Sequence, residues 1–214
     1  LPHLVKFKFP KGLKVIEKNQ FEGCHLSGSV EIPESCERIG FGAFSKAPIN
    51  KLVIKGPAVV EESAFSFCTA LKEIVISGGA RLLEGSFKYI MDTNNPNAGL
   101  ETLTLGNDVV VNKDAFYYCK HLTNICFDGK IDSVANGAFN SCKNIKNIVF
   151  NGSVRNLGSD VFKEMSIFRL DINDVQSWCS MSFDSKRSNP ISHAEEVYIN
   201  GSKELDLVLS EDIN

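Results

Sequence analysis

The chain has 214 residues, with 23 Lys and Arg against 26 Asp and Glu, a formal net charge of −3. This balance leaves no basic excess to neutralise phosphates, which argues against nucleic acid as a partner. The chain is 43% hydrophobic, as expected of a folded protein. It holds no apolar run of about 18 residues, so we expect no membrane insertion in this segment.

One repeated unit organises the sequence. It is clearest in residues 122–142, which open with L-x-x-I-x-F and close with A-F-x-x-C. The phenylalanine of the closing motif recurs at steps of 23, 21, 22, 29, 23 and 23 residues. A fixed period in the twenties predicts a solenoid, and an L-x-x-L-x-L opening is typical of leucine-rich repeats. The recurring residues are Phe21, Phe44, Phe65, Phe87, Phe116, Phe139 and Phe162.

Two other positions repeat in phase with these phenylalanines, one five residues earlier and one three residues later. A unit of this size cannot bury its own apolar face, so we expect the units to stack and to align equivalent residues into columns. The phenylalanines then form an aromatic spine. The earlier residues are Ile16, Ile39, Val60, Leu82, Val111, Val134 and Leu157, and the later ones are Cys24, Ala47, Cys68, Ile90, Cys119, Cys142 and Met165.

Each unit is expected to contain a short strand, a turn, a second extended or turn-like segment, and one helical turn that carries A-F-x-x-C. Clusters of Gly, Asn, Asp and Pro after the strands supply the turns. The strands are predicted within residues 4–9, 26–32, 49–54, 71–76, 100–105, 122–127 and 145–150, and an eighth strand is predicted at residues 167–172.

The step of 29 residues marks an insertion at residues 91–99, MDTNNPNAG. Insertions in solenoids become loops on one face, and we expect a solvated loop here. The alternatives are a recognition loop, or a weak calcium site formed by Asp92, Asn94, Asn95 and Asn97. Calcium prefers six to eight oxygen ligands, often carboxylates, and only Asp92 is charged, which disfavours the calcium site.

The repeats resemble the BspA-type leucine-rich repeat of about 23 residues. The resemblance rests on Ile32 with Pro33, on Ile39 with Gly40, and on A-F-x-x-C-x-x-L at residues 115–122, and it covers residues 4–165. It implies a right-handed, β-rich solenoid of seven to eight repeats, with one parallel sheet along the strand face. It also implies a surface or secreted protein of a host-associated bacterium, because members of this family attach to host proteins or to other cells.

We assign residues 1–165 to the solenoid and residues 166–214 to an irregular C-terminal repeat or cap. In the cap, Trp178, Met181 and Phe183 are expected to cover the open end of the apolar stack, because terminal repeats need a cover. A binding role for Trp178 is the alternative.

The last residues, 205–214, read as the opening of a further repeat, with Leu205, Leu207 and Leu209 in strand alternation. The chain is therefore either capped by this strand or part of a longer protein.

No motif in the sequence predicts catalysis, a metal site or a cofactor. Of seven cysteines, four occupy one repeat position that is otherwise apolar, which predicts a buried column of free thiols. A disulfide between Cys119 and Cys142, on adjacent coils, is geometrically possible but not expected. The four histidines are scattered, and no C-x-x-C, H-E-x-x-H, G-x-S-x-G or phosphate-binding loop occurs. We therefore expect a protein that is not an enzyme.

The strand face is the candidate binding surface, because the x positions of L-x-x-L-x-L point away from the core. One column of these residues should carry charge at its ends and uncharged or apolar residues in its middle, the pattern of a protein-binding surface. The alternative is that β-branched residues merely suit strands. The candidate face comprises Lys51, Val53, Glu73, Val75, Thr102, Thr104, Asn124, Asn147 and Val149.

These observations predict a non-enzymatic, extracellular or cell-surface module that binds a host or neighbouring-cell protein. One alternative is a rigid structural spacer in a longer surface protein. Another is a glycan-binding module, which needs exposed aromatic residues on its recognition face. The predicted columns hold none, and Tyr89, Tyr117, Tyr118 and Trp178 lie elsewhere in the repeats.

Overall fold

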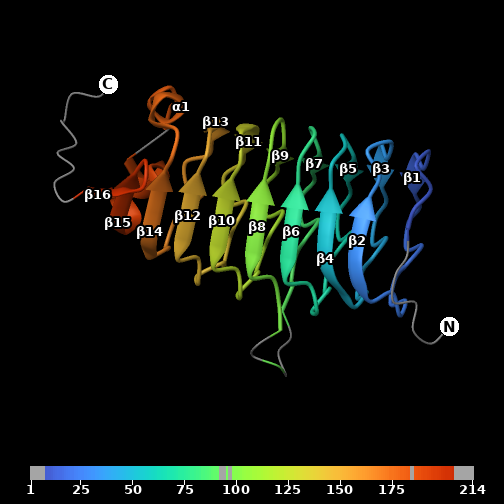
Figure 1. Ribbon diagram of the computed structural model, residues 1–214. Helices are drawn as coiled ribbons and strands as arrows, with labels where there is room; N and C mark the ends of the chain where they lie inside the picture. The colour runs from blue at the N-terminus through green and yellow to red at the C-terminus, as the bar shows by residue number, and fades with distance from the viewer. Residues whose placement is uncertain (1–7, 92–94, 96–97, 184–185, 205–214) are drawn as a thin grey trace.

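The computed structural model describes the chain except for residues 1–7, 92–94, 96–97, 184–185 and 205–214. The coils stack into an elongated solenoid with its ends at opposite sides (Figure 1). The predicted leucine-rich-repeat solenoid is confirmed. The first predicted strand lies largely outside the described residues, as do Asp92, Asn94 and Asn97 of the calcium alternative and the predicted strand at Leu205–Leu209.

The strand face is a nine-stranded sheet in the order β16-β15-β14-β12-β10-β8-β6-β4-β2. Its pairs are parallel except for the last, between β15 and β16. Large apolar residues alternate along the strands from β2 to β12, so one side of the sheet is buried there. The strands are β2 Gly28–Ile32, β4 Ile49–Ile54, β6 Glu73–Ile76, β8 Thr102–Leu105, β10 Asn124–Phe127, β12 Asn147–Phe150, β14 Ile167–Ile172, β15 Ala194–Ile199 and β16 Ser202–Glu204.

The second segment of each repeat forms a parallel sheet of seven strands, where the sequence predicted only an extended or turn-like stretch. The aliphatic residue five before each spine phenylalanine lies in this sheet, and successive copies are partners in its register. The column from Ile16 to Leu157 is thereby confirmed. The strands are β1 Val15–Ile16, β3 Arg38–Ile39, β5 Val59–Val60, β7 Arg81–Leu82, β9 Val110–Val111, β11 Lys130–Val134 and β13 Ser153–Leu157.

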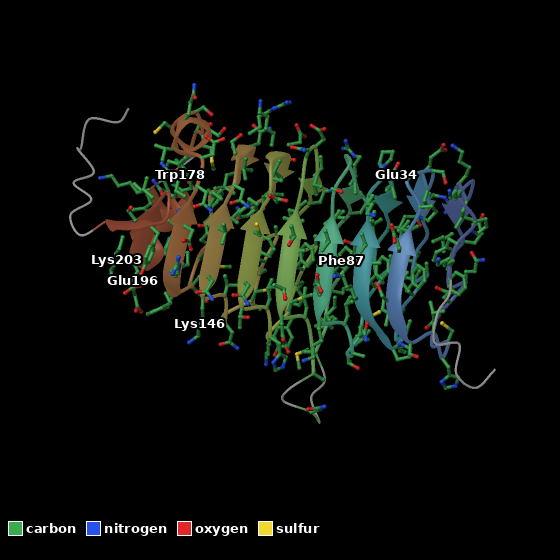
Figure 2. The ribbon with its side chains drawn as sticks, in the orientation of Figure 1. Glu34, Phe87, Lys146, Trp178, Glu196 and Lys203 are labelled. Carbon is green, nitrogen blue, oxygen red and sulfur yellow. The ribbon has the colours of Figure 1, made fainter. Side chains whose placement is uncertain are left out.

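The phenylalanine spine runs through the core as predicted. Phe44, Phe65 and Phe87 stack in series with ring centroids 5.0 Å apart, and Phe116 continues the series at 5.0 Å. All of these rings are fully buried, and Figure 2 labels Phe87 in the middle of the solenoid. The stacking distance follows the spacing of neighbouring strands, about 4.8 Å.

The A-F-x-x-C segment is not a helical turn, which corrects the prediction. It is a chain of tight turns. From Phe21 to Phe139, the residues two before and two after each spine phenylalanine have positive φ, as Gly42 (φ 62) and Lys46 (φ 61) do around Phe44. The backbone N–H of the spine residue Phe44 donates to the carbonyl oxygen of Ala64 on the next coil at 2.7 Å. Hydrogen bonds run between coils here, and the small buried residue before Phe44, Phe65, Phe87, Phe116 and Phe139 permits this close approach.

The C-terminal part continues the main sheet across residue 165. β14 pairs in register with β12, and β15 pairs with β14. The division of the chain into two domains at residue 165 remains a prediction. The helix α1, Val175–Cys179, and two short 3-10 helices, η1 Lys186–Ser188 and η2 Pro190–His193, connect these two strands. Trp178 lies on α1, where it is buried and packs edge-on against Phe150, with ring centroids 4.9 Å apart. Its cover of the open end of the stack remains a prediction.

Candidate functional site: the strand face

The central column of the strand face aligns as predicted. Sheet pairing places Val53 beside Val75, Val75 beside Thr104, and each later residue beside its counterpart. The side chains in the middle of the column are partly exposed, while Leu52, Ile74 and Leu103 between the columns are buried. The aligned residues are Glu31, Val53, Val75, Thr104, Cys126, Val149 and Asp171.

The neighbouring column is polar and partly cross-linked between coils. Lys51 forms an ion pair with Glu73 at 2.7 Å, and Asn147 donates to the side-chain oxygen of Asn124 at 2.7 Å. These contacts hold the polar groups in place beside the apolar column. The aligned residues are Ser29, Lys51, Glu73, Thr102, Asn124, Asn147, Arg169 and Glu196.

A third row of polar residues lies on the other side of the central column, at the ends of the strands. Asn151 donates to Asp128 at 3.1 Å, and Asn173 donates to Asn151 at 2.9 Å. Toward the first coils, Lys55 donates to Glu31 at 2.8 Å, and this hydrogen bond lowers the pKa of Glu31. The apolar column is therefore bordered by polar groups on both sides.

The sequence prediction missed Tyr198, which occupies the end of the central column. The register of β15 places Tyr198 beside Asp171, and the guanidinium of Arg169 lies 3.8 Å from the centre of the Tyr198 ring. Arg169 also donates to both carboxylate oxygens of Asp171 at 2.7 Å, which raises the Arg169 pKa. The strand of Tyr198 lacks the repeat landmarks, so only sheet pairing reveals its position.

Charged groups at this end of the sheet are joined to one another. Figure 2 shows Glu196 and Lys203 close together, where they form an ion pair between β15 and β16. The hydrogen bond from Lys203 lowers the pKa of Glu196, and the Tyr198 hydroxyl donates to the same carboxylate at 3.1 Å. This polar end contrasts with the valines in the middle of the face.

Cys126 is the one residue of the central column with nucleophilic potential. Burial raises the pKa of its thiol, and the nearby Asp128 carboxylate raises it further. The thiol is therefore protonated at neutral pH and is a poor nucleophile. Among the residues that the structure describes, no group of three or more His, Cys, Asp or Glu side chains is placed to hold a metal ion.

A separate open hollow of about 700 Å³ lies between α1 and the strands β11 and β13. Three of its charged side chains have protein partners: Arg155 forms an ion pair with Asp132 at 3.1 Å, and Asp174 accepts from the Ser177 N–H at 2.9 Å to cap α1. Because these groups already have protein partners, the strand face remains the better candidate site. No helix within the described part of the chain is long and apolar enough to span a membrane.

The parallel coils, the aliphatic columns and the strand face define a leucine-rich-repeat solenoid. The family model described as BspA type leucine rich repeat region matches residues 2–109 and 109–202, with 6 copies. The chain therefore belongs to the BspA-type leucine-rich repeat family.

Among solved structures, the chain is similar to a leucine-rich repeat protein from Bacteroides ovatus, with 15% sequence identity and a TM-score of 0.28. The match covers 76% of this chain and 61% of that protein, so the chain spans less than two thirds of its length. A comparison with curated proteins gives no match.

Proposed function

We propose that the protein is a non-enzymatic surface or secreted module that binds a host or neighbouring-cell protein through its strand face. The supporting observation is the central column, in which Val53, Val75, Thr104, Cys126 and Val149 form a partly exposed stripe bordered by polar residues. An apolar centre with a polar rim is the usual anatomy of a protein interface. Leucine-rich repeats also interact with proteins in general.

The dimensions of the face agree with this role. From β2 to β14 the sheet crosses six strand spacings, a length of about 29 Å. A standard interface buries about 800 Å² on each partner, so a partner must also contact the polar columns on both sides. An elongated or gently curved protein surface fits a sheet of this shape.

The family also supports the proposed location, because BspA-type proteins are commonly surface or secreted proteins. The strand face has no carboxylate pair around a cleft, and its thiol is protonated, so binding accounts for the arrangement better than catalysis does. The competing proposal is a rigid spacer. The continuous hydrophobic core supports it, because such a core stabilises the solenoid without a bound ligand.

A binding screen tests the proposal directly. The protein is presented to a panel of extracellular-matrix and plasma proteins at low and physiological salt, and saturable binding is measured by surface plasmon resonance. We expect at least one partner whose binding survives physiological salt, because the centre of the face is uncharged. If no protein of the panel binds, the role of a rigid spacer is favoured instead.

A further inference from the structure

Four aromatic side chains from three successive repeats meet on the turns that precede β6, β8 and β10. Phe67 is 44% exposed and stacks on Tyr89, with ring centroids 5.2 Å apart. Tyr89 meets Tyr117 edge to face at 5.5 Å and Tyr118 at 5.8 Å. We call Phe67, Tyr89, Tyr117 and Tyr118 the turn-edge aromatic cluster. It lies outside the phenylalanine spine and apart from the columns of the strand face.

The fold does not require aromatic residues at these positions. Phe67, Tyr89 and Tyr118 each lie two residues after a spine phenylalanine and have φ of 58°, 58° and 62°. Bulky residues rarely adopt this conformation, and side chains other than glycine are strained in it. The equivalent residues in the other described coils are Gly23, Lys46, Ser141 and Glu164, with φ of 59° to 64°.

The solenoid therefore accommodates glycine or a polar residue at the turn edge. Three successive coils nevertheless carry a strained aromatic residue there, and these rings remain at least partly exposed. Exposed clusters of aromatic side chains are typical of ligand-binding surfaces rather than of cores.

The turns around the cluster form a polar rim, and most of the charges on it are paired. Lys88 forms an ion pair with Glu62 at 2.7 Å, and Lys113 forms one with Asp114 at 3.9 Å. Asn140 also donates to Asp114, at 3.2 Å. Lys120 lies 4.3 Å from the centre of the Tyr118 ring. The surface thus offers ring surfaces, phenolic hydroxyls, an amide and an ammonium group together, with little excess charge.

We propose that the turn-edge aromatic cluster binds a neutral linear oligosaccharide. A pyranose ring presents apolar C–H groups on its faces, which pack against aromatic rings, and hydroxyl groups at its edge, which both donate and accept hydrogen bonds. Tyrosine suits such a ligand because it combines an apolar body with a polar tip. Since the ion pairs leave little net charge at the rim, a neutral ligand is favoured over an acidic peptide.

The extent of the cluster agrees with a short oligosaccharide. Its rings come from three successive coils, which span about 10 Å along the solenoid axis. A patch of this length is much smaller than the area of about 800 Å² that each partner buries in a standard protein interface. The site is distinct from the strand face, so each of the two proposals fails independently of the other.

The test measures binding of cello-, laminari-, manno-, chito- and malto-tetraose by saturation-transfer NMR and titration calorimetry. The variant Phe67→Asn/Tyr89→Asn/Tyr118→Asn removes three rings, and asparagine tolerates the left-handed backbone. The matched control is Phe168→Asn, which removes an aromatic side chain that is 49% exposed on β14. Circular dichroism and thermal melting establish that both variants are folded.

We expect at least one tetrasaccharide to bind the wild type, with affinity that changes little between low and physiological salt. The triple variant should lose at least tenfold in affinity, and Phe168→Asn should bind like the wild type. Two results overturn the proposal: no saccharide binds the wild type, or the folded triple variant binds as well as the wild type.

Discussion

The thiol of Cys142 donates a hydrogen bond of 3.1 Å to the carbonyl oxygen of Phe116, the spine residue of the preceding coil. Cys68 makes the same contact with Phe44 at 3.0 Å, and Cys119 makes it with Phe87 at 3.2 Å. The predicted column of buried thiols is therefore confirmed for Cys68, Cys119 and Cys142, which are free, while Cys24 at its start is only partly buried. A small, apolar side chain with a weak donor suits this position.

The buried thiols should resist chemical modification. Burial raises the pKa of Cys68 to about 12, and burial also raises the pKa of Cys119 well above its ordinary value. A thiol reagent at about pH 8 should modify the exposed Cys179 quickly and leave Cys68, Cys119 and Cys142 intact until the protein unfolds. Mass spectrometry of labelled peptides with and without urea checks this, and fast labelling of Cys142 in the folded protein would contradict the column.

Cys68 should also make the protein less stable at alkaline pH. The unfolded thiol ionises near the ordinary pKa of 9.0, whereas the folded thiol keeps its proton up to about 12. Between these values the unfolded state binds fewer protons, so stability falls as pH rises, with a contribution from Cys68 of about 1.4 kcal/mol per pH unit.

The variant Cys68→Ala tests this, since alanine occupies the equivalent position as Ala47. Urea unfolding of both proteins at about pH 8 and about pH 10.5 gives the comparison. The difference in stability should move in favour of the variant at the higher pH, and an unchanged difference would refute the assignment.

The aromatic spine should dominate the stability of the middle coils. Phe87 is fully buried between Phe65 and Phe116, so Phe87→Ala should lower the free energy of unfolding by about 3–5 kcal/mol. The control Phe168→Ala removes an exposed ring and should change stability by less than about 0.5 kcal/mol. Urea denaturation measures both, and similar losses in the two variants would argue against a spine.

The left-handed turn residues should accept glycine with a gain in stability. Ser63 has φ 59°, and Gly42 and Gly85 occupy the equivalent position in neighbouring coils. Relief of strain outweighs the greater freedom of the unfolded chain, so Ser63→Gly should stabilise the protein by about 0.5–1 kcal/mol.

The control Ser29→Gly lies in the extended strand β2, where glycine should destabilise by a similar amount. A thermal melt of each variant decides the question. A lower melting temperature for Ser63→Gly would show that the serine side chain contributes more than the strain removes.

The sequence allowed the solenoid and its columns to be predicted because the landmarks recur in phase. Once Leu52, Ile74 and Leu103 are aligned, the outward neighbours Val53 and Val75 follow from strand alternation. The candidate face was therefore predictable as geometry, and its role in binding remains a proposal.

The other features could not be predicted from the sequence, because they depend on contacts between different repeats. Strands as short as Val59–Val60 are too brief for alternation to distinguish them from turns. The positive φ of Phe67 and Tyr89 was hidden because these residues are not glycine. The turn-edge aromatic cluster combines two different repeat positions, so only the relative placement of the coils reveals it.

The most direct test of the proposed binding face uses the folded variant Val53→Asp/Val75→Asp. Its matched control is Val59→Asp, which changes a partly exposed valine in the other sheet, on β5. The measurement is the dissociation constant for a protein partner found in the binding screen. We predict at least a tenfold loss for the double variant and no more than about a twofold change for the control, because a charge buried at the centre of an interface costs far more than one beyond it. Wild-type affinity in the folded double variant would contradict the account.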